Sequence, residues 1–251
     1  DCAACNHHLP SQPKEKFIPQ KLASQPMELV GADLCEASGK HYLVCVDQFS
    51  GFILVKLLAN QRTSTVLHAM RSWFLLLGWP QRIRTDGGPC FRGEFRAFCK
   101  DNRIKQELAS AYNPESNGLA EAAVKNVKQL LYKCKEEQQD FEAALSAFRM
   151  VPRQDGQSPA DLFFNRRPKG HLPALPQDFP RSTLPGSTTR NKTLLQSQQK
   201  STGRNLSLFQ AGDLVMIQDP QTKLWEPGNT VVSIRDNGHS YEVRNPDGKT
   251  F

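Results

Sequence analysis

Apolar and polar residues alternate in the first third of the chain, which is the pattern of β-strands. The alternation predicts three short strands, at residues 28–35, 42–47 and 52–57, separated by turns rich in serine and glycine. From residue 64 to residue 77 the apolar positions recur every three or four residues, and Gly78 follows. This spacing predicts one amphipathic helix that ends at the glycine.

The segment after Gly78 changes period several times. It predicts two more strands, at residues 82–85 and 104–109, with a helix between them at residues 94–101. Three further helices are predicted after the second of these strands, at residues 118–138, 141–149 and 158–164. Because a helix connects the third strand to the fourth, we expect these two strands to run parallel. The order predicts an α/β core over residues 27–168, with a mixed five-stranded sheet flanked by helices.

Two stretches without periodicity flank this predicted core. Residues 9–26 contain four prolines, and residues 169–208 are rich in proline, serine and basic residues. Both compositions are typical of linkers. Residues 209–251 contain three more strand patterns joined by tight turns, and these predict a small β-barrel.

The positive charge of the chain is concentrated in one region. The chain carries a formal net charge of +7, and residues 166–204 contain eight Lys or Arg against one acid. Such a region suits a polyanion, so Arg166, Arg167 and Lys169 are candidate DNA contacts. No apolar run is long enough to span a membrane, and no targeting segment is visible, so we expect a soluble, unsecreted protein.

Seven cysteines make an odd number, and most lie within apolar runs. This usage predicts buried free thiols in a reducing compartment. Cys2 and Cys5 have the spacing of half a zinc site, which needs two further ligands. Residues 1–8 are therefore predicted to be either the remnant of a zinc-binding domain or an inert terminus.

Three carboxylates are candidates for a metal site. Asp86 follows a predicted strand and precedes Gly87-Gly88, Glu121 lies in the first turns of the following long helix, and Asp33 is predicted at another strand end. If the first and fourth strands are neighbours, Asp33 and Asp86 can share a divalent cation that Glu121 completes. Mg²⁺ prefers such oxygen ligands, and two ions about 3.5–4 Å apart can catalyse displacement at phosphorus.

Other polar residues compete with these three or assist them. Asp47 also ends a predicted strand, but the turn that follows favours a capping role, and Glu115 is interpreted as a loop charge or a substrate contact. Lys125 and Lys128 follow Glu121 by four and seven residues. They therefore share its helical face and are candidate phosphate contacts. The alternative for these lysines is a surface pair with Glu121. Further candidate DNA contacts lie on the loop before the helix, at Tyr112, Asn113 and Asn117.

These motifs resemble the integrases of retroviruses and, more closely, of gypsy-type LTR retroelements. The Asp, Asp-x35-Glu signature of that family matches Asp33, Asp86 and Glu121, although the last interval holds 34 residues here. The Asn-Pro-Gln-Ser-Asn-Gly segment appears as Asn113-Pro-Glu-Ser-Asn-Gly118, with Glu115 in place of glutamine. In similar integrases, lysines at the positions of Lys125 and Lys128 hold viral-end DNA.

The resemblance implies a ribonuclease-H-like core, an SH3-like C-terminal barrel, and a zinc domain to which Cys2 and Cys5 would contribute if a His pair upstream completes it. It also implies a nuclear enzyme that uses Mg²⁺ or Mn²⁺, assembles as a dimer or tetramer on DNA, trims 3′ ends and joins them to target DNA. Two alternatives stay open. One is a host-domesticated integrase that binds DNA, chromatin or protein without catalysis, and the other is a nuclease of the ribonuclease-H type.

Overall fold

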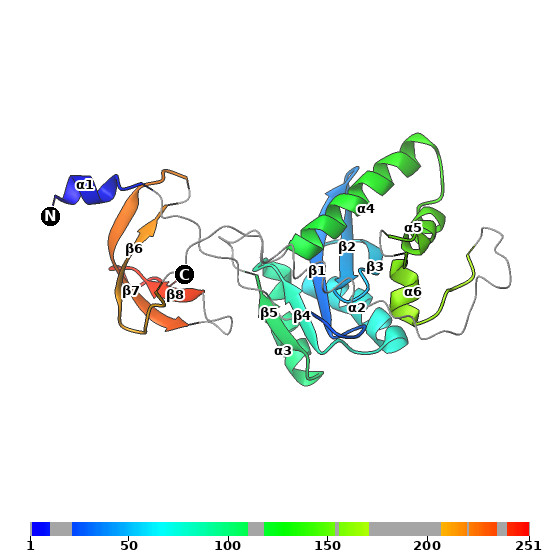
Figure 1. Cartoon of the computed structure of the whole chain (residues 1–251), viewed down its shortest axis with the longest axis horizontal. Coiled ribbons are helices and arrows are strands. Elements are labelled where there is room, and N and C mark those ends of the chain that lie inside the picture. Colours follow the sequence, from blue (N-terminus) through cyan, green and yellow to red (C-terminus); the bar gives the residue numbers. More distant parts are fainter. Residues whose placement is uncertain are drawn as a thin grey trace. The chain divides into compact units, whose positions relative to one another are not determined.

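The computed structural model describes residues 2–10, 22–109, 118–153, 156–170, 207–219, 221–234 and 240–250. The chain divides into two compact units (Figure 1). The larger unit is Gln20–Leu194, and the smaller combines Asp1–Pro19 with Leu195–Phe251.

A five-stranded sheet forms the centre of the larger unit. Its spatial order is β3-β2-β1-β4-β5, with bounds Leu29–Ala37 (β1), Lys40–Asp47 (β2), Ile53–Leu58 (β3), Arg82–Thr85 (β4) and Lys105–Leu108 (β5). The first three strands are antiparallel neighbours, whereas β4 runs parallel to both β1 and β5. The predicted mixed sheet is confirmed, and the two strands that carry the candidate aspartates are neighbours.

The turn between β1 and β2 fixes the register of this hairpin. Ala37 pairs with Lys40, so only Ser38 and Gly39 form the turn, with φ values of 50° and 70°. Positive φ at both central residues matches the twist of the flanking strands. The hairpin extends β1 well beyond its last pair with β4, Gly31 with Arg84.

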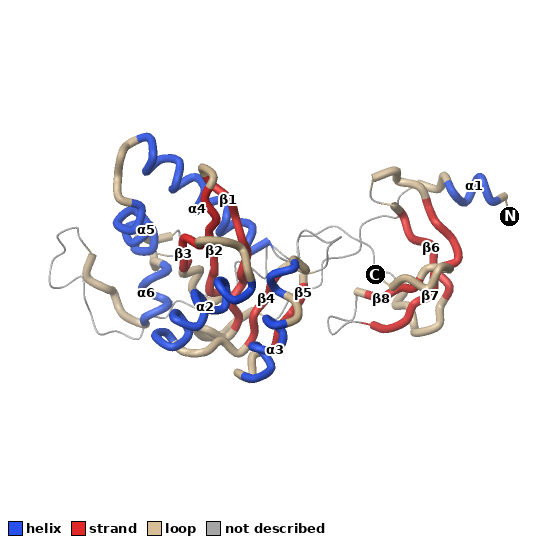
Figure 2. The backbone as a smooth tube through the Cα atoms, turned by 180° about the vertical axis from the view of Figure 1, so that it is seen from behind, coloured by secondary structure: helices blue, strands red, loops and turns tan. Residues whose placement is uncertain are grey.

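Helices cover both faces of the sheet, because the strands carry apolar residues on both sides (Figure 2). On β2, Leu43 and Cys45 belong to one core cluster, while Val44 and Val46 belong to the other. The first cluster packs against the helices α2 (Thr63–Leu77), η1 (Pro89–Phe91), α3 (Glu94–Asp101) and α6 (Pro159–Phe164). The second packs against α4 (Gly118–Glu136) and α5 (Phe141–Met150).

The smaller unit contains an antiparallel three-stranded sheet and one short helix. The sheet has the order β6-β7-β8, with bounds Leu214–Gln218, Trp225–Ile234 and Tyr241–Arg244. The helix α1 (Ala3–His7) is followed by Leu9, whose carbonyl accepts a hydrogen bond from Trp225 Nε1 at 2.9 Å. Three strands are fewer than an SH3-like barrel needs, so the described residues leave that barrel a prediction.

Helices long and apolar enough to cross a membrane are absent from the described ranges.

Candidate active site

The pairing of β1 with β4 places Asp33 and Asp86 side by side. Val30 pairs with Ile83 and Gly31 with Arg84 in parallel register, so two further residues along each strand bring Asp33 level with Asp86. The prediction that Asp33 ends its strand is wrong, because the hairpin with β2 continues β1 to Ala37. Asp33 instead lies where β1 passes the end of the shorter β4.

A tight turn holds Asp86 immediately after β4. The carboxylate accepts a hydrogen bond from the Gly88 backbone at 3.1 Å, and Arg92 Nε donates to the Gly87 carbonyl at 2.7 Å. A Cβ atom at Gly88 would lie 3.0 Å from Asp86 Oδ1, so the glycine leaves space for the carboxylate. From β5, Gln106 Nε2 donates to the Phe91 carbonyl at 2.8 Å and ties the following 3₁₀ helix to the sheet.

Glu121 approaches the strands because α4 packs closely over a glycine. A Cβ atom at Gly31 would lie 3.4 Å from the Cβ of Ala120 and 3.4 Å from Val46 Cγ1. Ala120 is fully buried, and its neighbour Glu121 is exposed in the first turn of the helix. Along β1, Gly31 and Asp33 point to the same face of the sheet, so α4 and Asp33 lie on one side.

Asp86 and Glu121 lie close enough to Asp33 to act on its carboxyl group. The pKa of Asp33 is raised to about 6, mainly by burial and to a lesser degree by the charges of Asp86 and Glu121. The Leu34 backbone N–H, 2.7 Å from Asp33 Oδ1, and the charge of Lys128 lower it. Because these two effects do not offset the burial and the two negative charges, the ionised form of Asp33 is disfavoured, which is the condition that a divalent cation relieves.

Lys128 and Cys90 also lie close to Asp33. Lys128 lies on the α4 face predicted for it and acts on Asp33, while Lys125 is exposed one turn earlier. The pKa of the Cys90 thiol is raised to about 11, mainly by burial and then by the charges of Asp86 and Asp33, so this thiol lies near the two carboxylates. Cys90, Gln106 and Gly31 were not predicted from the sequence, and only the position of Cys90 soon after Asp86 offered a signal.

The residues present suit a hard cation in chemistry, but their side chains do not form a complete ligand set. Asp33, Asp86 and Glu121 supply carboxylate oxygens, the ligands that Mg²⁺ prefers. Yet in the described part of the chain no three His, Cys, Asp or Glu side chains are grouped so that they could hold a metal ion.

The competing acid Asp47 has the structural role that the sequence favoured. It is buried, and its two carboxylate oxygens accept from the Met27 backbone at 2.9 Å and from the Ser50 backbone at 2.8 Å. The Ser50 hydroxyl adds a third hydrogen bond at 2.5 Å. These bonds cap the turn after β2 and tie it to the start of β1, so Asp47 is set apart from the metal candidates.

The remaining candidate DNA contacts lie on the loop before α4 and after α6. The loop candidates lie outside the described residues, and they are Tyr112, Asn113, Glu115 and Asn117. After α6, Lys169 is exposed, Arg166 lies 5.7 Å from the centre of the Phe164 ring, and Arg167 Nε lies 3.6 Å from the buried Asp161 Oδ1. These positions leave their DNA contacts a prediction.

Cys2 and Cys5 are exposed at α1, and the described residues bring no third ligand to them. The ring of His7, nearby in sequence, is held elsewhere: its Nδ1 donates to the Trp225 carbonyl at 2.7 Å. The zinc site stays a prediction.

A mixed sheet with helices on both faces and paired aspartates at the β1–β4 junction defines a ribonuclease-H-like α/β core. The family model described as Integrase core domain matches residues 23–114. This match confirms the predicted resemblance to integrases over these residues.

Relatives among known proteins include retroviral polyproteins. The Gag-Pro-Pol polyprotein of Simian retrovirus SRV-2 is 36% identical over 97 residues, which are 38% of this chain and 6% of that protein. The Gag-Pol polyprotein of Avian reticuloendotheliosis virus is 27% identical over 248 residues, 92% of this chain and 21% of that protein. The chain thus spans only a small part of the length of these relatives.

Among solved structures, a chain of the simian T-cell lymphotropic virus intasome in complex with PP2A regulatory subunit B56 gamma has a similar fold. The TM-score is 0.60 at 19% identity, and the match covers 96% of this chain and 84% of that chain. At this identity the likeness concerns the fold.

Proposed function

We propose that the protein is an integrase, a metal-dependent polynucleotidyl transferase that trims the 3′ ends of retroelement DNA and joins them to target DNA. The observation that carries the proposal is the placement of three carboxylates from separate elements near one another: Asp33 on β1 is level with Asp86 after β4, and both Asp86 and Glu121 on α4 act on Asp33. The integrase core domain over residues 23–114 supports the reaction class.

In this proposal Asp33, Asp86 and Glu121 bind two Mg²⁺ or Mn²⁺ ions. When bound, such ions activate the attacking oxygen and stabilise the leaving oxygen of an in-line displacement. The protein supplies the rest. The Gly87-Gly88 turn fixes the position of the Asp86 carboxylate. The close packing of α4 over Gly31 sets the distance of Glu121 from the sheet. Lys128 offers a DNA phosphate a positive charge beside Asp33.

The partners in this proposal are the duplex ends of the element and the target DNA. Lys125 and Lys128, the loop residues Tyr112, Asn113 and Asn117, and the basic residues Arg166, Arg167 and Lys169 would contact the DNA. The smaller unit, proposed to be an SH3-like barrel, would bind nucleic acid or chromatin. We further propose a homo-oligomer assembled on DNA in the nucleus.

The proposal is tested by Mg²⁺-dependent joining of a 3′-processed oligonucleotide end to a duplex target. We expect Asp86→Asn and Glu121→Gln to lower the joining rate by at least about a hundredfold, since each removes charge from the metal ligands. The matched control is Glu36→Gln, which removes an exposed carboxylate from the same strand as Asp33. Unchanged joining by either site variant, with circular dichroism showing intact folding, would refute the assignment.

One observation favours a second candidate, a domesticated integrase that binds DNA, chromatin or protein without catalysis. The described residues contain no three-ligand group that could hold a metal. The same assay separates the candidates, because wild-type protein that binds duplex DNA but joins nothing at any Mg²⁺ or Mn²⁺ concentration would be a binding module. Cleavage of an RNA–DNA hybrid in preference to duplex DNA would instead indicate a nuclease.

A further inference from the structure

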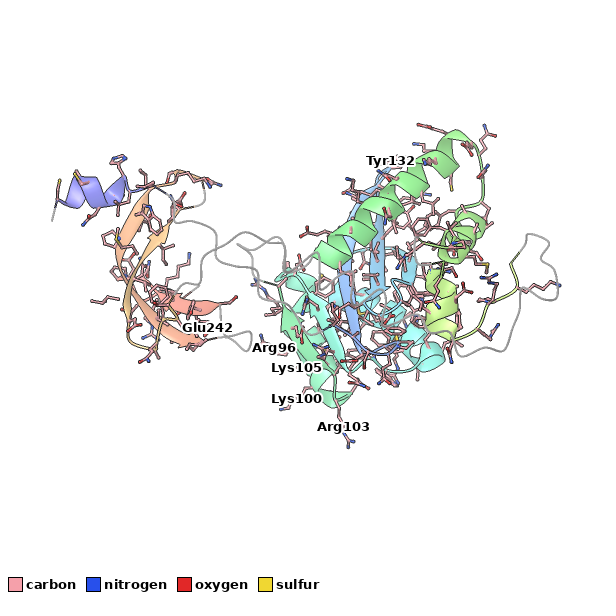
Figure 3. All side chains as sticks on the ribbon, in the orientation of Figure 1. Arg96, Lys100, Arg103, Lys105, Tyr132 and Glu242 are labelled. Carbon is pink, nitrogen blue, oxygen red and sulfur yellow. The ribbon has the colours of Figure 1, made fainter. Side chains whose placement is uncertain are left out.

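Four exposed basic residues gather at one edge of the larger unit. Arg96 and Lys100 belong to α3, Arg103 lies in the turn that follows, and Lys105 begins the edge strand β5. Figure 3 shows their side chains projecting from the same end of the core. We call these four residues the α3–β5 cluster.

The basic and the acidic residues of α3 lie on different faces of the helix. Arg96 and Lys100 are four residues apart and therefore share one face, whereas Glu94 and Asp101 lie at least about a quarter of a turn from either. A third face, with Phe95 and Cys99, is buried. Among the described residues, neither Arg96 nor Lys100 forms an ion pair within 4.0 Å, so both charges face solvent.

Arg103 occupies a backbone conformation that favours glycine. Its φ is 57°, and its N–H donates to the Lys100 carbonyl at 3.1 Å, which closes the end of α3. Left-handed φ at this helix-ending position costs a non-glycine residue stability. Arginine here therefore adds a charge to the cluster where glycine would suit the fold better.

The cluster lies apart from the three carboxylates. Lys105 pairs with Arg82 at the start of β4, whereas Asp86 follows the end of that strand, about 13 Å away at the rise of a β-strand. In addition, α3 belongs to the core cluster on the sheet face opposite to that of α4. The α3–β5 cluster therefore lies outside the carboxylate site.

The composition of this surface suits nucleic acid better than protein. The described range 92–105 contains no large apolar residue that is exposed, whereas protein interfaces use an apolar centre. Flexible cations spread over a helix and a strand edge match a repeating row of phosphates.

We propose that the α3–β5 cluster binds the phosphate backbone of a second segment of duplex DNA, independently of sequence. The inference rests on the proposed function only in taking DNA as the substrate, because backbone binding here requires neither the metal nor the carboxylates.

The test measures the affinity of the full chain for a 30-base-pair duplex of random sequence, in EDTA, over a series of salt concentrations. We expect Arg96→Ala/Lys100→Ala to bind roughly tenfold more weakly near 0.1 M salt and to lower the slope of log K against log salt by about 2. The matched control, Lys133→Ala/Lys135→Ala, removes two exposed lysines from the end of α4 and should keep the wild-type slope.

A second variant guards against a folding artefact. Arg103→Gly should weaken DNA binding while the melting temperature stays equal to or above that of the wild type, because glycine suits φ 57°. A wild-type slope in the Arg96→Ala/Lys100→Ala variant would overturn the proposal. So would weaker binding of a poly-glutamate peptide with DNA binding unchanged, which would indicate an acidic protein partner.

The two proposals fail separately. Joining that survives Asp86→Asn refutes the catalytic assignment and leaves the salt slopes unaffected. Wild-type slopes in the cluster variants refute the second DNA surface and leave the joining assay unaffected.

Discussion

Ionisation of Asp33 opposes folding, because the pKa of this carboxyl is raised in the folded protein. Its folded pKa of about 6 lies above the usual value for an aspartate, about 3.9, because the carboxyl is half-buried and faces Asp86 and Glu121. The neutral form is therefore favoured by folding. The corresponding stability is fully present below pH about 4 and is lost as the pH rises through about 6.

We accordingly expect Asp33→Asn to raise the free energy of unfolding at pH 8 by about 1 kcal/mol, discounted for the partial exposure of the group. At pH 3.5 the variant and the wild type should be equally stable, since Asp33 is then protonated in both the folded and unfolded chains. Urea unfolding at the two pH values measures this difference. A variant that is destabilised at pH 8 would show that ionised Asp33 has a stabilising partner instead.

At the scale of elements, the distance between α4 and the sheet decides where Glu121 lies. Gly31→Val would place branched methyl groups against Ala120 and Val46, where even a Cβ atom already reaches 3.4 Å. We expect this variant to move the helix outward, lower the joining rate at least about tenfold and destabilise the fold by roughly 1–3 kcal/mol.

Gly31→Ala is the matched control, because its single methyl group meets its neighbours at ordinary contact distance. It should retain most of the activity and stability. Thermal melting and the joining assay, run on both variants, measure the two effects. Wild-type joining by Gly31→Val would mean that the position of α4 does not limit the reaction.

The elements of the core were predictable from apolar periodicity, but their close contacts were not. Alternation and helical spacing predicted every strand of the sheet and the α-helices that flank it, but not the 3₁₀ helix η1, because only the former face a core cluster with a period long enough to read. Periodicity carries no information on pairs such as Gly31 with Ala120, or on the hydrogen bond from Gln106 to Phe91. These contacts depend on how neighbouring elements meet in space.

The site shows the same limit. The places of Asp86 and Glu121 in the fold were predictable because a glycine turn and a helix start mark them in the sequence. Asp33 was predicted beside Asp86 but at a strand end, because the apolar pattern does not reveal how far the hairpin carries β1 past β4. The electrostatic link from Lys128 to Asp33 also required the fold.

At the scale of the whole molecule, charge and chemistry are divided between regions. The carboxylates belong to the larger unit, while the excess of basic residues lies mainly at 166–204, between its last described helix and the sheet of the smaller unit. Clustered positive charge predicts a polyanion partner whatever the fold, and it is a separate signal from the alternating pattern that predicted the strands of the smaller unit.

The proposed metal site can be located by anomalous diffraction from crystals of the full chain soaked in Mn²⁺. We expect an anomalous peak bounded by Asp33 and Asp86, with Glu121 drawn toward it, and loss of that peak in Asp86→Asn. Crystals of an active protein that show no Mn²⁺ between these carboxylates at saturating concentration would contradict the proposed site.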